Sequence, residues 1–160
     1  MNNTINWQAK TFDQLSTNEL YDALKLRVDV FVVEQSCYYP ELDDCDRAEG
    51  VMHLLGYDNE QLVAYLRLLP KGVSYPDVVS IGRVATRADY RGKGIGHPLM
   101  SKALVVCEQQ WPGQNIKISA QEHLEKYYKQ HGFVRVSEMY LEDDIPHIAM
   151  LLEKQSSFKY

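Results

Sequence analysis

The sequence predicts one folded domain of the α/β (α+β) class that spans residues 1–160. Three observations support this class. Hydrophobic residues make up 45% of the chain and charged residues 24%, which is typical of a globular protein. Segments with helical spacing are interspersed with short runs of strand-favouring residues. No repeat, linker or low-complexity segment divides the chain, so we expect a single core.

The first predicted element is a helix. Ser16 and Glu19 match a capping box, and apolar residues then recur at helical spacing: Leu20, Leu24, Val28 and Phe31. The acidic segment 40–50 begins at a proline and ends at a glycine, so we interpret it as a solvated or substrate-facing loop. A calcium loop does not fit there, because Leu55 would occupy the position of the bidentate glutamate.

Strands are predicted in the middle and at the end of the chain. Segments 51–57 and 61–69 favour a β-hairpin, and the mostly apolar segment 78–86 favours a strand covered on both faces. Segment 115–120 indicates another strand. The tail 133–154 suggests two more strands around an acidic turn.

Two further helices are predicted in the second half. Leu99, Ala103 and Val106 have helical spacing, and the Trp-Pro-Gly sequence at 111–113 ends that helix. The last predicted helix carries four residues on one face, Leu124, Tyr127, Tyr128 and His131, and Gly132 closes its end.

Composition and charge exclude several classes of function. The chain has 17 Lys and Arg against 22 Asp and Glu, a net charge of −5, so nucleic acid is not expected as a partner. No apolar run is long enough to cross a membrane and the amino terminus lacks a signal-peptide layout, so we expect a cytoplasmic protein. The three cysteines lack a Cys-x-x-Cys pair and the histidines lack ligand spacing, so free thiols and no metal site are expected.

A glycine-rich stretch, "YRGKGIGHPLM", lies between the predicted strand 78–86 and the next helix. Glycines at such a position let consecutive backbone amides face one anion, and the helix dipole adds positive potential. Arg91 and Lys93 can add charge-assisted contacts. The pattern is neither a P-loop, which needs GxxxxGK[ST], nor a Rossmann fingerprint, which has a glycine where His97 stands. The stretch therefore predicts a site for a phosphate or diphosphate.

This stretch, read as R-x-x-G-x-G from Arg91 to Gly96, resembles motif A of the GNAT family of acyl-CoA-dependent N-acyltransferases. "HLEKYYKQHGF" resembles the family's motif B. The blocks "FVVEQSCYYPELDDCD", "AQEHLEKYYKQHGF" and "YLEDDIPHIAM" are similar to an ElaA-like branch, and the resemblance covers most of 16–150. It implies the GNAT fold: a central mixed, mostly antiparallel sheet that is splayed between two strands and flanked by helices.

The resemblance also implies acetyl-CoA, or a similar acyl-CoA, as cosubstrate and no metal. Its diphosphate would take amides from one loop: Arg91, Gly92, Lys93, Gly94, Ile95, Gly96 and His97. The pantetheine arm would pair with the backbone of Arg83, Val84 and Ala85. Gln121 stands where many relatives carry an asparagine that contacts the cofactor.

Catalytic candidates follow from the same resemblance. Tyr128 matches a tyrosine that acts as general acid toward the leaving thiolate, although a core aromatic is the alternative, and the amide near Val84 is the candidate oxyanion donor. Glu34 and His147 are candidates for the base that accepts the amine's proton. A surface carboxylate and a structural histidine are their alternatives. Five acids could form an anionic rim for an amine or could simply be solvated: Asp43, Asp44, Asp46, Asp143 and Asp144.

The expected function is direct transfer of an acetyl group to a primary amine on a small molecule or peptide. The resemblance is compatible with a homodimer. Two alternatives stay open. One is a module that binds acyl-CoA without catalysis, and the other is an acyl-homoserine-lactone synthase-like enzyme, which Arg27, Val30 and Phe31 suggest.

Overall fold

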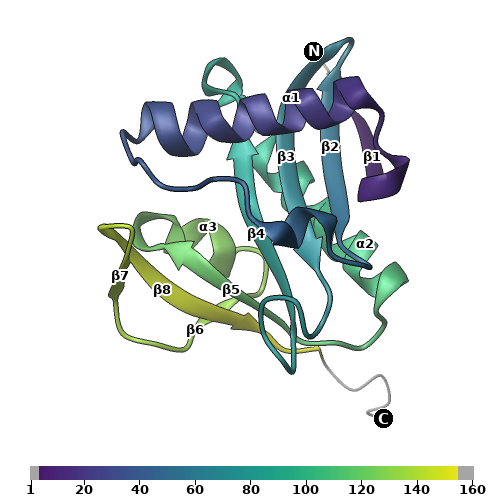
Figure 1. Ribbon diagram of the computed structural model, residues 1–160. Helices are drawn as coiled ribbons and strands as arrows, with labels where there is room; N and C mark the ends of the chain where they lie inside the picture. Colours follow the sequence, from purple (N-terminus) through teal and green to yellow (C-terminus); the bar gives the residue numbers. More distant parts are fainter. Residues whose placement is uncertain (1–3, 155–160) are drawn as a thin grey trace.

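The computed structural model describes residues 4–154 as one eight-stranded sheet with helices on both of its faces (Figure 1). The helices are α1 (Thr17–Arg27), α2 (Gly96–Gln110) and α3 (Glu125–Lys129). The strands are β1 (Asn6–Thr11), β2 (Met52–Asp58), β3 (Gln61–Leu69), β4 (Val79–Thr86), β5 (Ile116–Gln121), β6 (Val134–Arg135), β7 (Tyr140–Glu142) and β8 (Ile145–Leu152). Five shorter helical turns complete the chain: η1 (Phe12–Gln14), η2 (Val28–Glu34), η3 (Asp44–Arg47), η4 (Ala88–Tyr90) and η5 (Glu122–Leu124).

The sheet is mixed and mostly antiparallel, with strand order β1-β2-β3-β4-β5-β8-β6 and β7 paired to β8. The β4–β5 pair is its parallel junction, and it is short. Val79 pairs with Ile116 and Ser80 with Lys117, and no further pair joins these two strands. Beyond Ser80 the strands separate, as Figure 1 shows at the centre of the molecule. The predicted fold class, including the splay, is confirmed.

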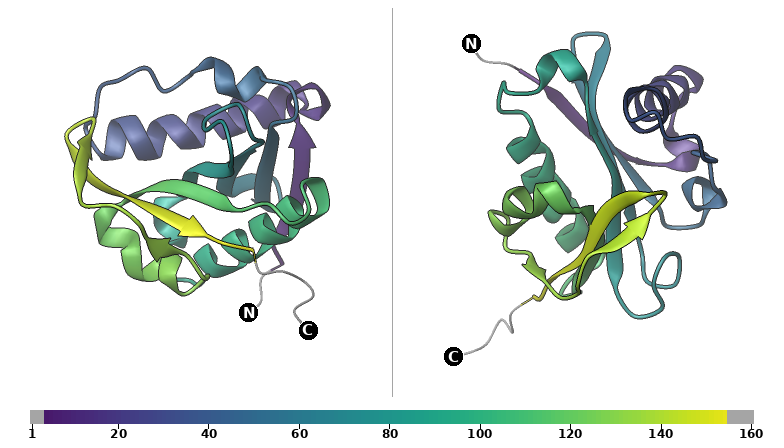
Figure 2. Two further views of the ribbon diagram at one scale, coloured as in Figure 1. Left: turned by 90° about the horizontal axis from the view of Figure 1, so that it is seen from below. Right: turned by 90° about the vertical axis from the view of Figure 1, so that its left-hand side faces the viewer.

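Helix α1 covers one face of the sheet, and α2 and α3 cover the other (Figure 2). Leu99, Met100 and Ala103 of α2 are fully buried in the larger core, on the α2 side. Ala23 and Leu26 of α1 join a smaller core against Tyr65 of β3. The capping box predicted for α1 is present, since the Glu19 amide donates to Ser16 Oγ and the Ser16 amide donates to the Glu19 carboxylate.

Two strands at the ends of the chain were missed or merged in the sequence prediction. Strand β1 was not predicted, although Ile5, Trp7 and Ala9 alternate with polar residues, and it forms a full antiparallel ladder with β2. Trp7 lies opposite Gly56, where an added Cβ would come within 2.5 Å of the indole ring, so only glycine fits. The tail forms three strands and not two, because the two-residue β6 precedes the predicted pair.

No helix among residues 4–154 combines the length and the apolar character that crossing a bilayer requires.

Candidate active site

Two neighbouring cavities lie beside the gap between β4 and β5 and share part of their walls. The first, of about 570 Å³, is lined by the glycine stretch Arg91, Gly92, Gly94, Gly96 and His97, and we name it the loop cavity. The second, of about 380 Å³, is lined by Arg67, Ser80, Glu142, Asp143 and His147, and we name it the hairpin cavity after the β7–β8 hairpin. Six residues line both: Phe31, Gln35, Val84, Gln121, Leu124 and Tyr128. A ligand that enters from the loop cavity can therefore reach the hairpin cavity at Val84 and Tyr128.

The glycine stretch has an open conformation. Gly92 and Gly94 have φ angles of +81° and +83°, in the left-handed region that favours glycine. A Cβ built on either residue would meet no atom within 4 Å, so the space beside the backbone is free. Helix α2 has no side-chain N-cap, and Pro98 in its first turn has no N–H, so the amides of Gly96 and His97 are not capped by a side chain. These features fit the diphosphate of an acyl-CoA.

Glu34 lies in the loop cavity and is paired with Arg91. The Arg91 Nη2 donates to Glu34 Oε1 at 3.0 Å and to the Thr86 carbonyl at 2.9 Å. The hydrogen bond from Arg91 lowers the pKa of Glu34 from its ordinary value, which weakens this carboxylate as a base. Glu34 does not line the hairpin cavity, so its geometry favours orientation of Arg91 over proton transfer from an amine.

Strand β4 contains an irregularity in its ladder with β3. Tyr65 pairs with Ala85 and Arg67 with Gly82, so Arg83 and Val84 together face the single residue Leu66. Arg83 has a φ of +52°, an uncommon value for a residue with a side chain. An extra residue in a bulge is left outside the regular ladder. The bulge therefore falls on the segment for which the sequence predicts cofactor pairing, at the junction of the two cavities.

The two adjacent tyrosines of α3 have different environments. Tyr127 donates a hydrogen bond of 2.6 Å from its hydroxyl to the Gly96 carbonyl, so it holds the start of α2. Tyr128 is 5% exposed and lines both cavities. Burial raises the pKa of Tyr128, so its hydroxyl stays protonated at neutral pH and can donate to a leaving sulfur.

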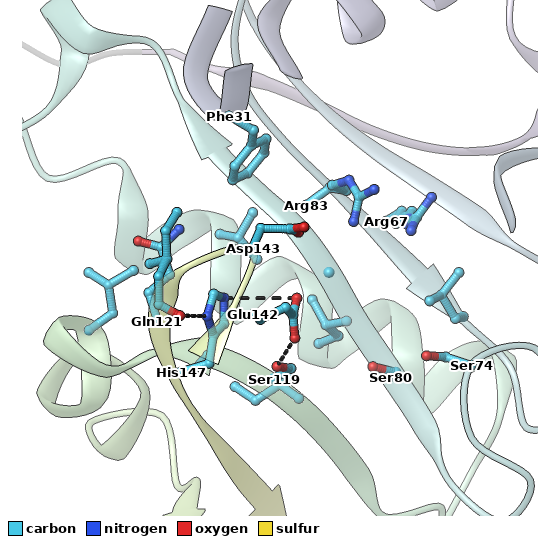
Figure 3. Close-up of a pocket in the computed structure, with 18 of the residues that line it drawn as sticks. Phe31, Arg67, Ser74, Ser80, Arg83, Ser119, Gln121, Glu142, Asp143 and His147 are labelled. Carbon is cyan, nitrogen blue, oxygen red and sulfur yellow. Dashed lines mark hydrogen bonds and ion pairs between the residues drawn. The ribbon is translucent and has the colours of Figure 1, made fainter. Parts of the chain in front are cut away.

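His147 lies on β8, in the wall of the hairpin cavity. Its Nδ1 is 2.7 Å from the Ile145 carbonyl, which can only accept, so Nδ1 carries the proton and Nε2 of the neutral ring has the free lone pair. Nε2 is 3.9 Å from the Glu142 carboxylate, which also accepts a 2.8 Å hydrogen bond from Ser119 Oγ. Figure 3 shows these three side chains together beside the cavity.

Gln121 is the last residue of β5 and lies at the junction of the cavities. Its Nε2 donates a long hydrogen bond of 3.4 Å to Gln35 Oε1, from the loop that follows η2. Lys93 is exposed, and its ammonium lies 5.3 Å from the centre of the Tyr90 ring. No group of three or more potential metal ligands lies together in the described part of the chain.

The acidic segment is not simply a solvated loop, and this part of the sequence interpretation was wrong. Glu41 and Asp46 are 4% and 5% exposed and form ion pairs with buried arginines. Three acids and three arginines make up this network, which we name the arginine network: Glu41, Asp43, Asp46, Arg27, Arg67 and Arg83. Asp44 and Glu49 lie outside this network and are exposed, with 92% of the Asp44 side chain accessible.

Sequence reasoning missed three cavity residues, Arg67, Ser119 and Glu142. The position of Arg67 in the sequence could have indicated a functional residue, because it is the one charged residue in the apolar run from Leu62 to Leu69. Ser119 and Glu142 had no comparable signal, since they meet only when β5 and the β7–β8 hairpin come together.

The family is settled by comparison with known proteins. The model of the acetyltransferase (GNAT) domain family matches residues 20–154. The chain belongs to the GNAT family. This GNAT protein is 44% identical to Protein ElaA of Escherichia coli over 149 residues, which are 93% of this chain and 97% of ElaA. It is 43% identical to a UPF0039 protein of Schizosaccharomyces pombe over 90% of this chain and 94% of that protein.

Solved structures agree with this assignment. An acyl-CoA N-acyltransferase from Pseudomonas aeruginosa superposes with a TM-score of 0.88 at 46% identity, covering 93% of this chain and 99% of the other. Escherichia coli ElaA superposes with a TM-score of 0.89 at 42% identity, covering 94% and 100%. The GNAT chain described here is therefore an acyltransferase of the ElaA-like branch.

The acyl-homoserine lactone synthase BjaI also superposes on this GNAT fold, with a TM-score of 0.78 over 96% of this chain and 85% of that one. At 19% identity this similarity shows the fold alone. Of the residues that suggested such an enzyme, Arg27 belongs to the arginine network and Phe31 lines both cavities.

Proposed function

We propose that this GNAT enzyme transfers an acetyl group from acetyl-CoA to the nitrogen of a primary amine. One observation carries the proposal. The loop cavity and the hairpin cavity meet at Val84 and Tyr128, in the gap where β4 and β5 separate. A thioester held from one side can thus meet an amine that arrives from the other, which gives the proximity that transfer requires.

The cofactor would be held by backbone groups. The amides of Gly92, Gly94, Ile95, Gly96 and His97 would receive the diphosphate at the start of α2, with Arg91 and Lys93 adding positive charge. The backbone of Arg83, Val84 and Ala85 would receive the pantetheine arm, because β5 does not pair with that stretch of β4. Gln121 would contact the arm from the opposite strand.

Transfer then needs one nucleophile and three proton movements. Most of the amine is an ammonium at neutral pH, so it must first lose a proton, for which His147 Nε2 is our candidate acceptor. The amine nitrogen forms a bond to the thioester carbonyl carbon, and the Val84 amide would stabilise the oxyanion. The carbon–sulfur bond breaks, and the Tyr128 hydroxyl would donate to the thiolate that leaves. The newly bonded nitrogen then gives up its second proton, which restores the Tyr128 phenol and leaves a neutral amide.

The electrostatics of the hairpin cavity suit a cationic acceptor. Glu142 and Asp143 line it from the β7–β8 hairpin and attract an ammonium group. Asp143 and Asp144 have φ angles of +51° and +64°, the geometry of a type I′ turn, so a tight hairpin fixes their position. This observation favours an amine over a hydroxyl acceptor.

The experiment is a panel of primary amines incubated with acetyl-CoA, with CoA thiol release and the mass of the product as readouts. We expect a product heavier than the amine by one acetyl group. Binding of acetyl-CoA without acetylation of any amine would favour the binding module. Faster turnover with long-chain acyl-CoA than with acetyl-CoA would contradict the acetyl assignment but not the transferase chemistry.

A further inference from the structure

We infer that the acceptor amine also carries a carbonyl or carboxylate oxygen, and that this oxygen binds the Nε–H of Arg67 in the hairpin cavity. The inference deepens the proposed function and rests on it. It makes Arg67 a specificity-determining residue of the acceptor site.

Arg67 extends from β3 into the wall of the hairpin cavity and is 4% exposed. Two of its three nitrogens have hydrogen-bond partners. Nη1 donates to Asp43 Oδ1 at 2.7 Å and to Asp46 Oδ1 at 2.9 Å, and Nη2 donates to Asp43 Oδ2 at 2.9 Å. Within residues 4–154, Nε of Arg67 is the single buried side-chain nitrogen or oxygen that has no hydrogen-bond partner. Buried polar groups nearly always have a partner, so this donor calls for a ligand.

The neighbouring arginines provide an internal comparison. Arg27 Nε donates to Glu41 Oε2 at 2.8 Å, and Arg83 Nε donates to the same oxygen at 2.7 Å. The arginine network can therefore satisfy an Nε–H, and it does so for both of these residues. It leaves this donor without a partner on Arg67, whose side chain lines the cavity where the acceptor would bind.

Charge balance decides what kind of group the donor would recognise. The three arginines of the network are matched by three carboxylates, so the network presents no net positive charge. It presents a fixed donor, because two carboxylates hold the Arg67 guanidinium in place. A fixed N–H donor can bind either a charged or a neutral hydrogen-bond-accepting oxygen. A carboxylate and an amide carbonyl both supply such an oxygen.

The opposite wall recognises the other end of the molecule. Figure 3 shows Arg67 and His147 on different sides of the cavity, with Glu142 beside His147 and Asp143 between His147 and Arg83. The amine would lie beside these acidic side chains and His147, and the oxygen would lie beside Arg67. The cavity of about 380 Å³ has room for a small acceptor with both groups.

The test compares matched acceptors on the wild-type enzyme. The set consists of β-alanine, γ-aminobutyrate and δ-aminovalerate, each with its primary amide and with the alkylamine of the same chain length. With saturating acetyl-CoA, we expect one chain length at which the acid or the amide exceeds the alkylamine by at least about tenfold in kcat/KM, because the alkylamine leaves the donor unpaired. The acid-to-amide ratio identifies which oxygen is preferred.

A ratio below about twofold at every chain length, or preference for the alkylamine, would overturn the inference and leave the transferase proposal standing. If acetyl-CoA binds but no amine of any set reacts, the proposed function fails instead, and the inference fails with it.

A variant tests the residue itself. Arg67→Lys keeps a positive charge beside Asp43 and Asp46 but removes the Nε–H, so the preference for oxygen-bearing acceptors should fall to about onefold, mainly through KM. The matched control is Arg87→Lys. In the wild type, Arg87 pairs with Asp89 outside both cavities, so this variant should keep the preference for oxygen-bearing acceptors. Circular dichroism verifies that each variant is folded. If Arg67→Lys does not fold, the comparison of matched acceptors on the wild-type enzyme still tests the inference. An unchanged preference in a folded Arg67→Lys would contradict the assignment.

Discussion

Tyr127 joins helix α3 to the first residue of α2 by donating a hydrogen bond of 2.6 Å to the Gly96 carbonyl. The next residue, Tyr128, turns instead to the junction of the two cavities. We therefore expect these two adjacent phenols to have separable roles, one in the shape of the glycine stretch and one in chemistry.

The variants Tyr128→Phe and Tyr127→Phe should separate these roles. We expect Tyr128→Phe to lower kcat by about a hundredfold, as loss of a general acid does, with little change in acetyl-CoA affinity. Tyr127→Phe should weaken acetyl-CoA binding severalfold with a smaller effect on kcat. Steady-state kinetics and calorimetry measure the two quantities. Equal kcat values in Tyr128→Phe and the wild type would remove Tyr128 from the chemistry.

Glu34 and His147 were equal candidates for the base in the sequence, and the structure distinguishes them. His147→Gln should lower kcat/KM for the amine by about a hundredfold, because the ring that would accept the proton is lost. Glu34→Gln frees Arg91 from its ion pair and should change the KM for acetyl-CoA more than kcat. The same initial-rate assay serves both variants. A larger loss of kcat in Glu34→Gln than in His147→Gln would reverse the assignment.

Asp46 is shared by Arg27 and Arg67, so loss of its charge takes one of two carboxylate partners from each buried guanidinium group. We expect Asp46→Asn to lower the free energy of unfolding by about 3 kcal/mol in urea titrations. The control is Asp44→Asn, where an exposed pair with Arg47 is lost and the change should stay below about 0.5 kcal/mol. Similar losses in the two variants would show that the arginine network adds little to stability.

The network should also make stability depend on pH. Its hydrogen bond with Arg67 lowers the pKa of Asp43 to about 2, against a value of about 3.9 in the unfolded chain. Because the pKa is lower in the folded state, this stabilisation is complete above about pH 4 and is lost as the pH falls toward about 2.

Urea unfolding of the wild type and of Asp43→Asn across that range measures the effect. We expect the wild type to lose about 1 kcal/mol more than the variant between those pH values, since partial exposure of Asp43 screens the interaction. Parallel pH curves for the two proteins would contradict this.

The parts of the fold that the sequence predicted are those with local signals. The capping box of Ser16 and Glu19 is a four-residue motif that marks the start of α1. Gly92 and Gly94 mark a loop that requires positive φ. Strand β1 was missed although Ile5, Trp7 and Ala9 alternate with polar residues, whereas its place beside β2 depends on a distant fit, that of Trp7 against Gly56.

The site was harder to predict for the same reason. The acids at 41–46 look solvated in the sequence, since the arginines that bury them lie on α1, β3 and β4. Likewise Arg91 and Glu34 are 57 residues apart, and no local sequence pattern predicts that they form an ion pair. Backbone conformation at the glycine stretch was predictable, whereas the partners of charged side chains were set by the topology.

Calorimetric titration with acetyl-CoA tests the central claim most directly, using the wild type, Gly94→Val and Gly113→Val. Gly94 and Gly113 share a positive φ, +83° and +75°, and open space at Cβ, but only Gly94 lies in the loop cavity. Both substitutions should therefore carry similar backbone strain of about 1–2 kcal/mol. The account predicts saturable binding to the wild type and Gly113→Val, and affinity at least about tenfold weaker in folded Gly94→Val. Equal affinity in all three proteins, or no binding to the wild type at millimolar acetyl-CoA, would contradict it.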